Sequence, residues 1–385
     1  MKTNVMNLRH RWLVIHLYLG LLLGLVLTIV GITGSLLVFY TELDEILNPQ
    51  LVVTDFSKPK LAYESLFQSL RTAEPERQKG WRLEIPDSPE RMVTARYYKP
   101  RETEHAVFAP LMVAIDPYTG EIVRKALWGQ YAMTWIYDLH YTLLLDRNGK
   151  IIMAVVGGLC LISLVSGLYL WWPSTHKWRS ALSIKRHASS QRFIYDLHKT
   201  SGVYSAAVML ILALTGVALE VPEYINPAID FASPLQTPPK PKSTLGQDHY
   251  RKITLDQALA IAQRYYPQAR LCWIETAHDP EGAIRINFRQ PWEPSQRFPK
   301  TNIWIDQYSG EVLAINDPQD FSSGDTLITW LHPLHSGEAL GLTGRLLVLA
   351  AGILCPVLFL TGLLRWMQKR QAGKRKKGLA HARLL

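Results

Sequence analysis

The chain has 385 residues, of which 19% are charged, and its mean hydropathy is +0.00. This average suits a soluble protein of two or three domains, but the apolar residues are concentrated in a few stretches. The formal net charge is +10, and the basic residues border those stretches instead of alternating with aromatic residues that stack on bases, which argues against a nucleic-acid partner. The three cysteines are widely spaced and Cys-x-x-Cys-His does not occur, which excludes a disulfide framework and covalently attached c-type haem.

Four apolar stretches reach the ~20 residues that a helix needs to cross a bilayer. They cover residues 12–40, 151–172, 201–220 and 346–367. The first stretch is too long for a signal peptide and lacks a small-residue cleavage site, so we expect it to remain a span. The sequence therefore predicts an α-helical membrane protein with four transmembrane helices.

The distribution of Lys and Arg predicts the orientation of these helices. Residues 1–12 carry three basic groups and no acid, residues 173–199 carry six and one acid, and residues 365–385 carry eight and no acid. Because basic segments remain in the cytoplasm, both termini and the middle loop are expected there. The two long connections, 41–133 and 221–329, are then expected in the periplasm of a bacterial inner membrane.

Two sets of residues recur along the chain at constant spacing, which indicates a tandem duplication. His16, Gly20, Thr33 and Gly34 match His198, Gly202, Thr215 and Gly216, and Trp135, Leu139, His140, Cys160 and Gly167 match Trp330, Leu334, His335, Cys355 and Gly362. Parallel copies of this kind are related by a pseudo-twofold axis along the membrane normal. The first copy is predicted to comprise the N-terminus with the first helix (1–40), a periplasmic domain (41–133) and an interfacial segment with the second helix (134–172). A cytoplasmic loop (173–199) joins it to the second copy. This copy comprises the third helix (200–220), a second periplasmic domain (221–329) and an interfacial segment with the fourth helix (330–367), followed by a basic tail (368–385).

Each long connection has the pattern of a small α+β domain. Helical periodicity is followed by short β-rich runs: a helix at 61–73 with strands near 81–85, 92–98, 111–115 and 121–126, and a helix at 254–265 with strands at 270–275, 283–288, 301–305 and 311–314. The pattern Asp-x-Tyr-[Ser/Thr]-Gly-Glu at 116–121 and 306–311 predicts a hairpin turn, in which Asp caps the turn and Gly supplies a positive φ. Neither domain contains a catalytic triad or a metal-binding motif, so a binding or scaffolding role is expected.

Four histidines occupy matched positions near the predicted helices. His16 and His198 lie at the cytoplasmic ends of the first and third helices, and His140 and His335 precede the second and fourth. Ionisable groups near a bilayer are costly and usually carry function, although a single helical histidine is more often structural. Because histidine recurs in both copies at both faces, we expect two bis-imidazole sites, each holding a haem iron.

Neighbouring residues bear on this hypothesis. Gly20 and Gly202 lie one helical turn beyond their histidines, where a missing Cβ would let a flat macrocycle approach the backbone; close helix packing is the alternative role. Zinc or copper is the alternative metal, disfavoured because the histidines have no carboxylate or thiolate in register. His332 precedes His335 by three residues and is either an alternate ligand or a group that contacts the ligand.

The paired His-x3-Gly…Thr-Gly helices, Tyr-Asp-Leu-His at 137–140 and 195–198, Leu-His-Ser-Gly at 334–337 and the two hairpin turns resemble the PepSY-associated transmembrane proteins over residues 8–370. Within this family, the chain is most similar to the iron-regulated inner-membrane siderophore reductases of the FoxB type. The resemblance implies two b-type haems, one on His16 and His198 and one on His140 and His335. It also implies oxidoreductase activity towards a periplasmic ferric siderophore, of the hydroxamate type, with electrons from a cytoplasmic or quinol donor.

Three other functions remain open. A siderophore permease is disfavoured because four helices with few buried polar groups provide no hydrophilic path. A quinone-linked di-haem cytochrome without siderophore activity would use the same histidines. A regulatory or binding protein that acts through the two long connections alone would leave the four repeated histidines unexplained.

Overall fold

The computed structural model describes residues 2–174, 176–244 and 251–382, with side chains from residue 8 to residue 374. The chain divides into two compact units. The helical unit comprises Met1–Val38, Tyr137–Pro222 and Leu334–Leu385, and the sheet unit comprises Phe39–Ile136 and Glu223–Pro333. The sequence-predicted segment 221–329 includes residues 245–250, and the predicted tail ends at residue 385; residues 245–250 and 383–385 lie outside the described part.

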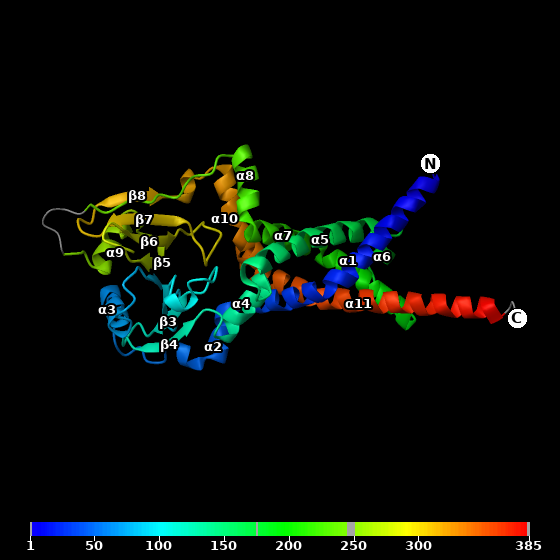
Figure 1. Ribbon diagram of the computed structural model, residues 1–385, viewed down its shortest axis with the longest axis horizontal. Coiled ribbons are helices and arrows are strands. Elements are labelled where there is room, and N and C mark those ends of the chain that lie inside the picture. The colour runs from blue at the N-terminus through cyan, green and yellow to red at the C-terminus, as the bar shows by residue number, and fades with distance from the viewer. Residues whose placement is uncertain (1, 175, 245–250, 383–385) are drawn as a thin grey trace. The chain divides into compact units, whose positions relative to one another are not determined.

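The helical unit is built from four long helices that run side by side (Figure 1). These are α1 (Lys2–Leu37), α5 (Asp146–Trp171), α7 (Ser190–Glu220) and α11 (Gly341–Ala382). Within the described residues, four helical segments are long and apolar enough to cross a membrane, which confirms the predicted spans. Helix α1 packs against α5 and α11, and α7 packs against the same two helices. The four helices therefore close into a ring of contacts.

Small residues allow α1 and α11 to approach closely. A Cβ atom added to Gly31 would lie 2.6 Å from the carbonyl oxygen of Gly352. The hydroxyl of Ser35 donates a hydrogen bond to the carbonyl of Leu349 on α11, at 3.0 Å. Lipid tails are as apolar as side chains, so close backbone contact and hydrogen bonding between helices stabilise such a bundle.

Shorter helices connect the long ones. Helices α4 (Ala132–Thr142) and α10 (Ser323–Ser336) carry His140 and His335 and precede α5 and α11. The remaining short elements are α2 (Tyr40–Leu47), α6 (Trp178–Ala181), α8 (Pro222–Ala232) and the 3-10 helices Pro49–Leu51, Arg101–Thr103, Pro318–Asp320 and Glu338–Leu340.

The sheet unit contains one antiparallel sheet, which has eight strands among the described residues (Figure 1). Its order is β4-β3-β2-β1-β5-β6-β7-β8. The strands are β1 (Arg82–Glu84), β2 (Val93–Tyr97), β3 (Leu111–Ile115), β4 (Ile122–Leu127), β5 (Arg270–Glu275), β6 (Ala283–Arg289), β7 (Thr301–Asp306) and β8 (Val312–Asn316).

The two long connections share this sheet instead of forming separate domains. Each supplies four strands, and β1 of the first pairs with β5 of the second through Leu83 and Ile274. An unpaired strand exposes backbone donors and acceptors to other chains, and edge-to-edge pairing of β1 with β5 removes two such edges. The strand positions agree with the sequence prediction, but the joining of the two modules is a correction to it.

One face of the sheet is covered by α3 (Tyr63–Ala73) and α9 (Leu255–Gln263) (Figure 1). Alternate residues of a strand point to opposite faces, so Leu83 and Ile274 enter the core with Leu70 and Ala258, and each of these side chains is fully buried. The opposite face carries polar and aromatic residues, among them Arg82, Glu275 and Trp304.

The two hairpin turns have the predicted geometry. A carboxylate oxygen of Asp116 accepts hydrogen bonds from the backbone N–H groups of Tyr118 and Thr119 at 2.7 and 3.1 Å, and Asp306 does the same in the second turn. Gly120 and Gly310 both have φ of +76°, a conformation that costs little only for glycine.

Leu83→Ala is expected to destabilise the sheet unit by about 2–5 kcal/mol, because it removes a fully buried side chain at the β1–β5 junction and leaves a cavity. Limited proteolysis across a urea series would measure the loss. Ile46→Ala, at a side chain that is 71% exposed, is the control and should change stability by less than about 0.5 kcal/mol. Equal effects of the two substitutions would contradict the packing described here.

Candidate functional site

His16 on α1 and His198 on α7 form the first histidine pair. Their ring centroids are 6.3 Å apart and their planes are inclined at 75°. Both side chains are partly buried within the helical unit. The structure therefore brings together these two sequence-predicted residues, which are far apart in the chain.

His140 on α4 and His335 on α10 form the second pair with nearly the same geometry. Their centroids are 6.2 Å apart and the interplanar angle is 57°. Both predicted pairings are thus present in the helical unit.

The spacing of the rings fits a metal held between them. Imidazole nitrogen binds first-row metals at ~2.0–2.1 Å, and a ring centre lies about 1 Å behind its nitrogen, so two axial imidazoles have centroids about 6 Å apart. The observed 6.2 and 6.3 Å agree with this value. Direct contact between two rings gives similar distances, so the orientation of the ring nitrogens has to be considered as well.

Each ring directs its Nδ1 atom towards a backbone carbonyl of a neighbouring long helix. Nδ1 of His16 lies 3.0 Å from the carbonyl of Ser163 on α5, and Nδ1 of His198 lies 3.1 Å from that of Leu358 on α11. Nδ1 of His140 lies 3.1 Å from the carbonyl of Val30 on α1. His335 makes the corresponding hydrogen bond to Leu212 on α7.

These contacts determine the tautomer. A carbonyl oxygen can only accept, so each Nδ1 carries the hydrogen and donates, which leaves the lone pair on Nε2. Histidines that bind metals almost always donate their other N–H to a carbonyl or carboxylate in this way. All four histidines are therefore held in the tautomer that a metal ligand requires.

A hydroxyl group stands beside each accepting carbonyl. Thr33, Ser166, Thr215 and Thr361 place their hydroxyl oxygens 2.9–3.2 Å from the Nδ1 atoms of His140, His16, His335 and His198 respectively. Each hydroxyl donates to a carbonyl of its own helix, as Thr33 does to Ile29 at 2.7 Å. Its lone pairs therefore face the imidazole N–H, which stabilises one ring orientation.

A glycine follows each of these hydroxyl residues and makes room for the ring. A Cβ atom added to Gly34 would lie 2.8 Å from Cε1 of His140, and the distances for Gly167 to His16, Gly216 to His335 and Gly362 to His198 are 3.0, 3.1 and 3.4 Å. The repeated Thr-Gly dipeptides are visible in the sequence as matches, but their role as the support of the imidazoles was not predicted.

Gly20 and Gly202 occupy different surroundings. A Cβ atom at Gly20 would have no neighbour within 4 Å, and one at Gly202 would touch only Leu358, at 3.6 Å. Neither glycine is needed for helix packing of the kind seen at Gly31. The open space beside them agrees with the predicted approach of a flat group and leaves that prediction untested.

His332 belongs to the sheet unit. Its ring packs edge-on against Phe298, with centroids 4.7 Å apart. Its predicted role, as an alternate ligand or as a group that contacts the ligand, stays a prediction.

The two pairs lie near opposite ends of the bundle. His16 and Val30, which contacts the second pair, are 14 residues apart on α1, roughly 21 Å at 1.5 Å per residue. This distance is most of the ~30 Å thickness of a hydrocarbon core.

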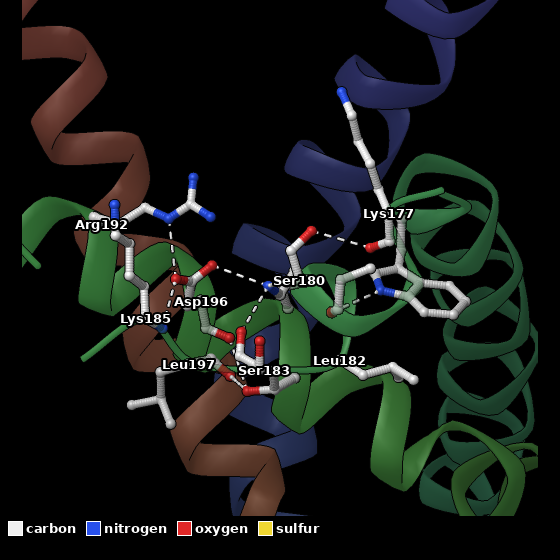
Figure 2. Close-up of polar contacts among 12 residues, drawn as sticks. Lys177, Ser180, Leu182, Ser183, Lys185, Arg192, Asp196 and Leu197 are labelled. Carbon is white, nitrogen blue, oxygen red and sulfur yellow. Dashed lines mark hydrogen bonds and ion pairs between the residues drawn. The ribbon is translucent and has the colours of Figure 1, made fainter. Parts of the chain in front are cut away.

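A polar cluster anchors the loop before α7 close to His198 (Figure 2). The ammonium group of Lys199 donates to the carbonyls of Ser180 and Ser183 at 2.8 and 3.0 Å, and to the carboxylate of Asp196 at 2.9 Å. Asp196, fully buried, also accepts from the guanidinium of Arg192 at 3.0 Å. These residues hold the first turns of α7 in place and were not predicted from the sequence, although Asp stands two residues before His in both Tyr-Asp-Leu-His motifs.

The number of donors is small for a bare metal ion. Among the described residues, no three His, Cys, Asp or Glu side chains gather in a group that could hold one. Structural zinc takes four protein ligands, whereas a haem iron has four ring nitrogens of its own and needs only two axial ones. The donor set of each pair therefore fits haem better than zinc or copper.

Comparison with known families gives a consistent assignment. A family model described as "PepSY-associated TM region" matches residues 13–369. The chain therefore belongs to the PepSY-associated transmembrane family, and its four long helices and antiparallel sheet agree with that assignment. No curated protein matches the chain.

Gly34→Ala is expected to displace the ring of His140, because its new Cβ would lie 2.8 Å from Cε1, closer than van der Waals contact allows. If each histidine pair holds one haem, the haem content should fall from two towards one per chain, as measured by pyridine haemochrome. Gly158→Ala on α5, where a Cβ would have no neighbour within 4 Å, is the matched control and should retain both. Full haem content with an unchanged spectrum in Gly34→Ala would contradict the proposed support of His140.

Proposed function

We propose that this protein is a b-type haem oxidoreductase of the bacterial inner membrane that delivers electrons to a ferric siderophore in the periplasm. The observation that carries the proposal is the presence of two histidine pairs near opposite ends of the bundle, each with its Nε2 lone pairs free. Both pairs have the centroid separation that a shared axial metal requires.

The residues around the sites would perform a single task, which is to hold neutral imidazoles still. The Nδ1–H hydrogen bonds to helix carbonyls fix the ring orientation and make Nε2 more basic. The low dielectric of the bundle favours the neutral ring over imidazolium. Haem, when bound, would supply one-electron chemistry at each pair, and an outer site would serve an acceptor that the inner site cannot reach.

The matched contacts of the two halves support the proposed tandem duplication. The pairs Thr33–His140 and Thr215–His335 repeat, as do Ser166–His16 and Thr361–His198. The basic ends of the helices support a cytoplasmic location for both termini and a periplasmic location for the sheet unit. Reduction of Fe(III) to Fe(II) weakens binding by hard oxygen ligands, which explains how such a protein would release iron.

The quinone-linked cytochrome is the second candidate, because the same histidine pairs would serve it equally well. A permease or a regulatory protein gains no support from the pairs. Acceptor specificity therefore separates the two redox functions, and haem content separates both from the others.

His16→Ala and His198→Ala are each expected to lose one haem, and His140→Ala and His335→Ala to lose the other, because the two ligands of each haem lie at the same depth in the bundle. Difference spectra of the four purified variants would show two spectral classes. His10→Ala, at an exposed position on α1, should retain both haems. A colourless wild-type protein from haem-sufficient cells, or loss of the same component in His16→Ala and His335→Ala, would refute the arrangement.

Chemically reduced protein mixed with a ferric siderophore is expected to reoxidise, and a ferrous-specific chelator should trap the product. Substitution of His140 or His335 should abolish the transfer, whereas substitution of His16 should spare a reaction started by a reductant that reaches the periplasmic side. If reduced protein is inert to every ferric siderophore but is oxidised by quinone, the cytochrome function replaces the one proposed.

A further inference from the structure

A row of four charged residues and one tryptophan crosses five strands on the face of the sheet that α3 and α9 leave uncovered. The pairing register places Arg96, Arg82, Glu275, Arg285 and Trp304 opposite one another on β2, β1, β5, β6 and β7. These side chains point away from the apolar core because their neighbours, such as Leu83 and Ile274, point into it.

The charged row is largely removed from solvent. Side-chain exposure is 12% for Arg82, 14% for Arg96 and 14% for Glu275. Arg82 and Arg96 are direct cross-strand partners, and like charges in this position are destabilising. Apolar residues at these positions would make the sheet more stable, which indicates that the charged residues serve a function.

Ion pairs compensate part of the charge. Arg82 and Arg285 bind the carboxylate of Glu275 at 2.7 and 2.5 Å, and Arg96 binds Glu84 at 2.8 Å. Burial acts to raise the pKa of Glu275, but the two guanidinium groups outweigh it and hold that pKa below its ordinary value. The carboxylate of Glu275 is therefore ionised and already paired with both arginines.

Positive charge remains in excess. Lys300 interacts electrostatically with the same groups. Burial lowers its pKa, the negative charge of Glu293 raises it, and the positive charges of Arg285 and Arg82 lower it further. Glu293 directs its carboxylate to the backbone of Gln290 and Lys300 and to the hydroxyl of Thr301. In and beside the row, four basic residues stand against three acidic ones: Arg82, Arg96, Arg285 and Lys300 against Glu84, Glu275 and Glu293.

Several donors on this face of the sheet are buried without a partner. Nε of Arg96, Nε of Arg285 and Nε1 of Trp273 have no hydrogen-bond partner among the described residues. A buried donor without a partner costs about 1–3 kcal/mol. Three such donors on one face are the arrangement expected where a ligand with several oxygen acceptors binds.

Aromatic rings hold the guanidinium groups in place. Arg82 lies 4.3 Å from the ring centroid of Trp273 and 5.3 Å from that of Tyr98. Arg96 stacks at 5.8 Å on Phe108, and Arg285 lies 6.0 Å from Trp304. Arginines fixed in this way present preoriented forks that match carboxylate groups bidentately.

We infer that this face binds a multiply anionic ferric complex of the polycarboxylate, citrate-like class. The inference rests on the proposed function for the presence of iron and names the chemical class of the substrate. A ferric tris-hydroxamate core is neutral and offers no charge to the arginines, so the face favours polycarboxylate complexes over the hydroxamate type expected from the resemblance.

The test is titration of the full-length detergent-purified protein with gallium(III) citrate, a redox-inert analogue of the ferric complex, by calorimetry. We expect binding that weakens with ionic strength. Arg96→Gln should weaken it about 10- to 100-fold, the loss of a charge-assisted hydrogen bond. Arg96→Lys keeps the pairing with Glu84 but lacks the bidentate fork, so an intermediate loss is expected even if Arg96→Gln folds poorly. Arg264→Gln, exposed beyond the end of α9, is the matched control and should bind like the wild type.

The outcomes distinguish this inference from the proposed function. Binding of gallium citrate that none of these substitutions changes, or no binding at all, would overturn the polycarboxylate site. Ferrioxamine B, a ferric hydroxamate, is the second ligand: if it is reduced while gallium citrate does not bind, the site is overturned and the reductase function stands. If neither ferric complex is reduced, the reductase function fails, and the gallium titration still decides whether the face is an anion site.

Discussion

The helical unit depends on one repeated interaction, the hydrogen bond from a histidine Nδ1 to a carbonyl of a neighbouring helix. It links α1 to α5, α4 to α1, α7 to α11 and α10 to α7. A helix carbonyl already accepts an intrahelical bond, but it has a second lone pair, and the adjacent hydroxyl provides a further acceptor. Because this interaction determines both the tautomer and the ring orientation, the remaining lone pair of every imidazole is available to a metal.

Much of this arrangement could be predicted from the sequence. The lengths of the apolar stretches predicted the four helices, and the runs with a period of two predicted the bounds of the strands to within about two residues. The pairing of His16 with His198 followed from the repeat alone. The support of each ring by Thr-Gly or Ser-Gly could not be predicted, because nothing in the spacing indicates which helix a histidine faces. The matched dipeptides were visible, yet helix packing explained them equally well.

The sheet was predicted less completely for a physical reason. Each connection has its own helix and four strands, so local patterns describe two modules of similar form. Edge pairing of β1 with β5 depends on hydrogen bonds between strands that are far apart in the chain, and no local pattern encodes it. The same joining brings Arg82 next to Glu275, so the charged row is a property of the assembled sheet and of neither half.

The central claim is that two histidine pairs each bind one haem iron through both imidazoles. Electron paramagnetic resonance of the oxidised protein at low temperature tests this claim most directly. Two low-spin ferric signals of equal intensity are expected, both with the large anisotropy of imidazole planes that are far from parallel, since the planes are inclined at 75° and 57°. A high-spin ferric signal, or a single low-spin species at one equivalent per chain, would contradict it.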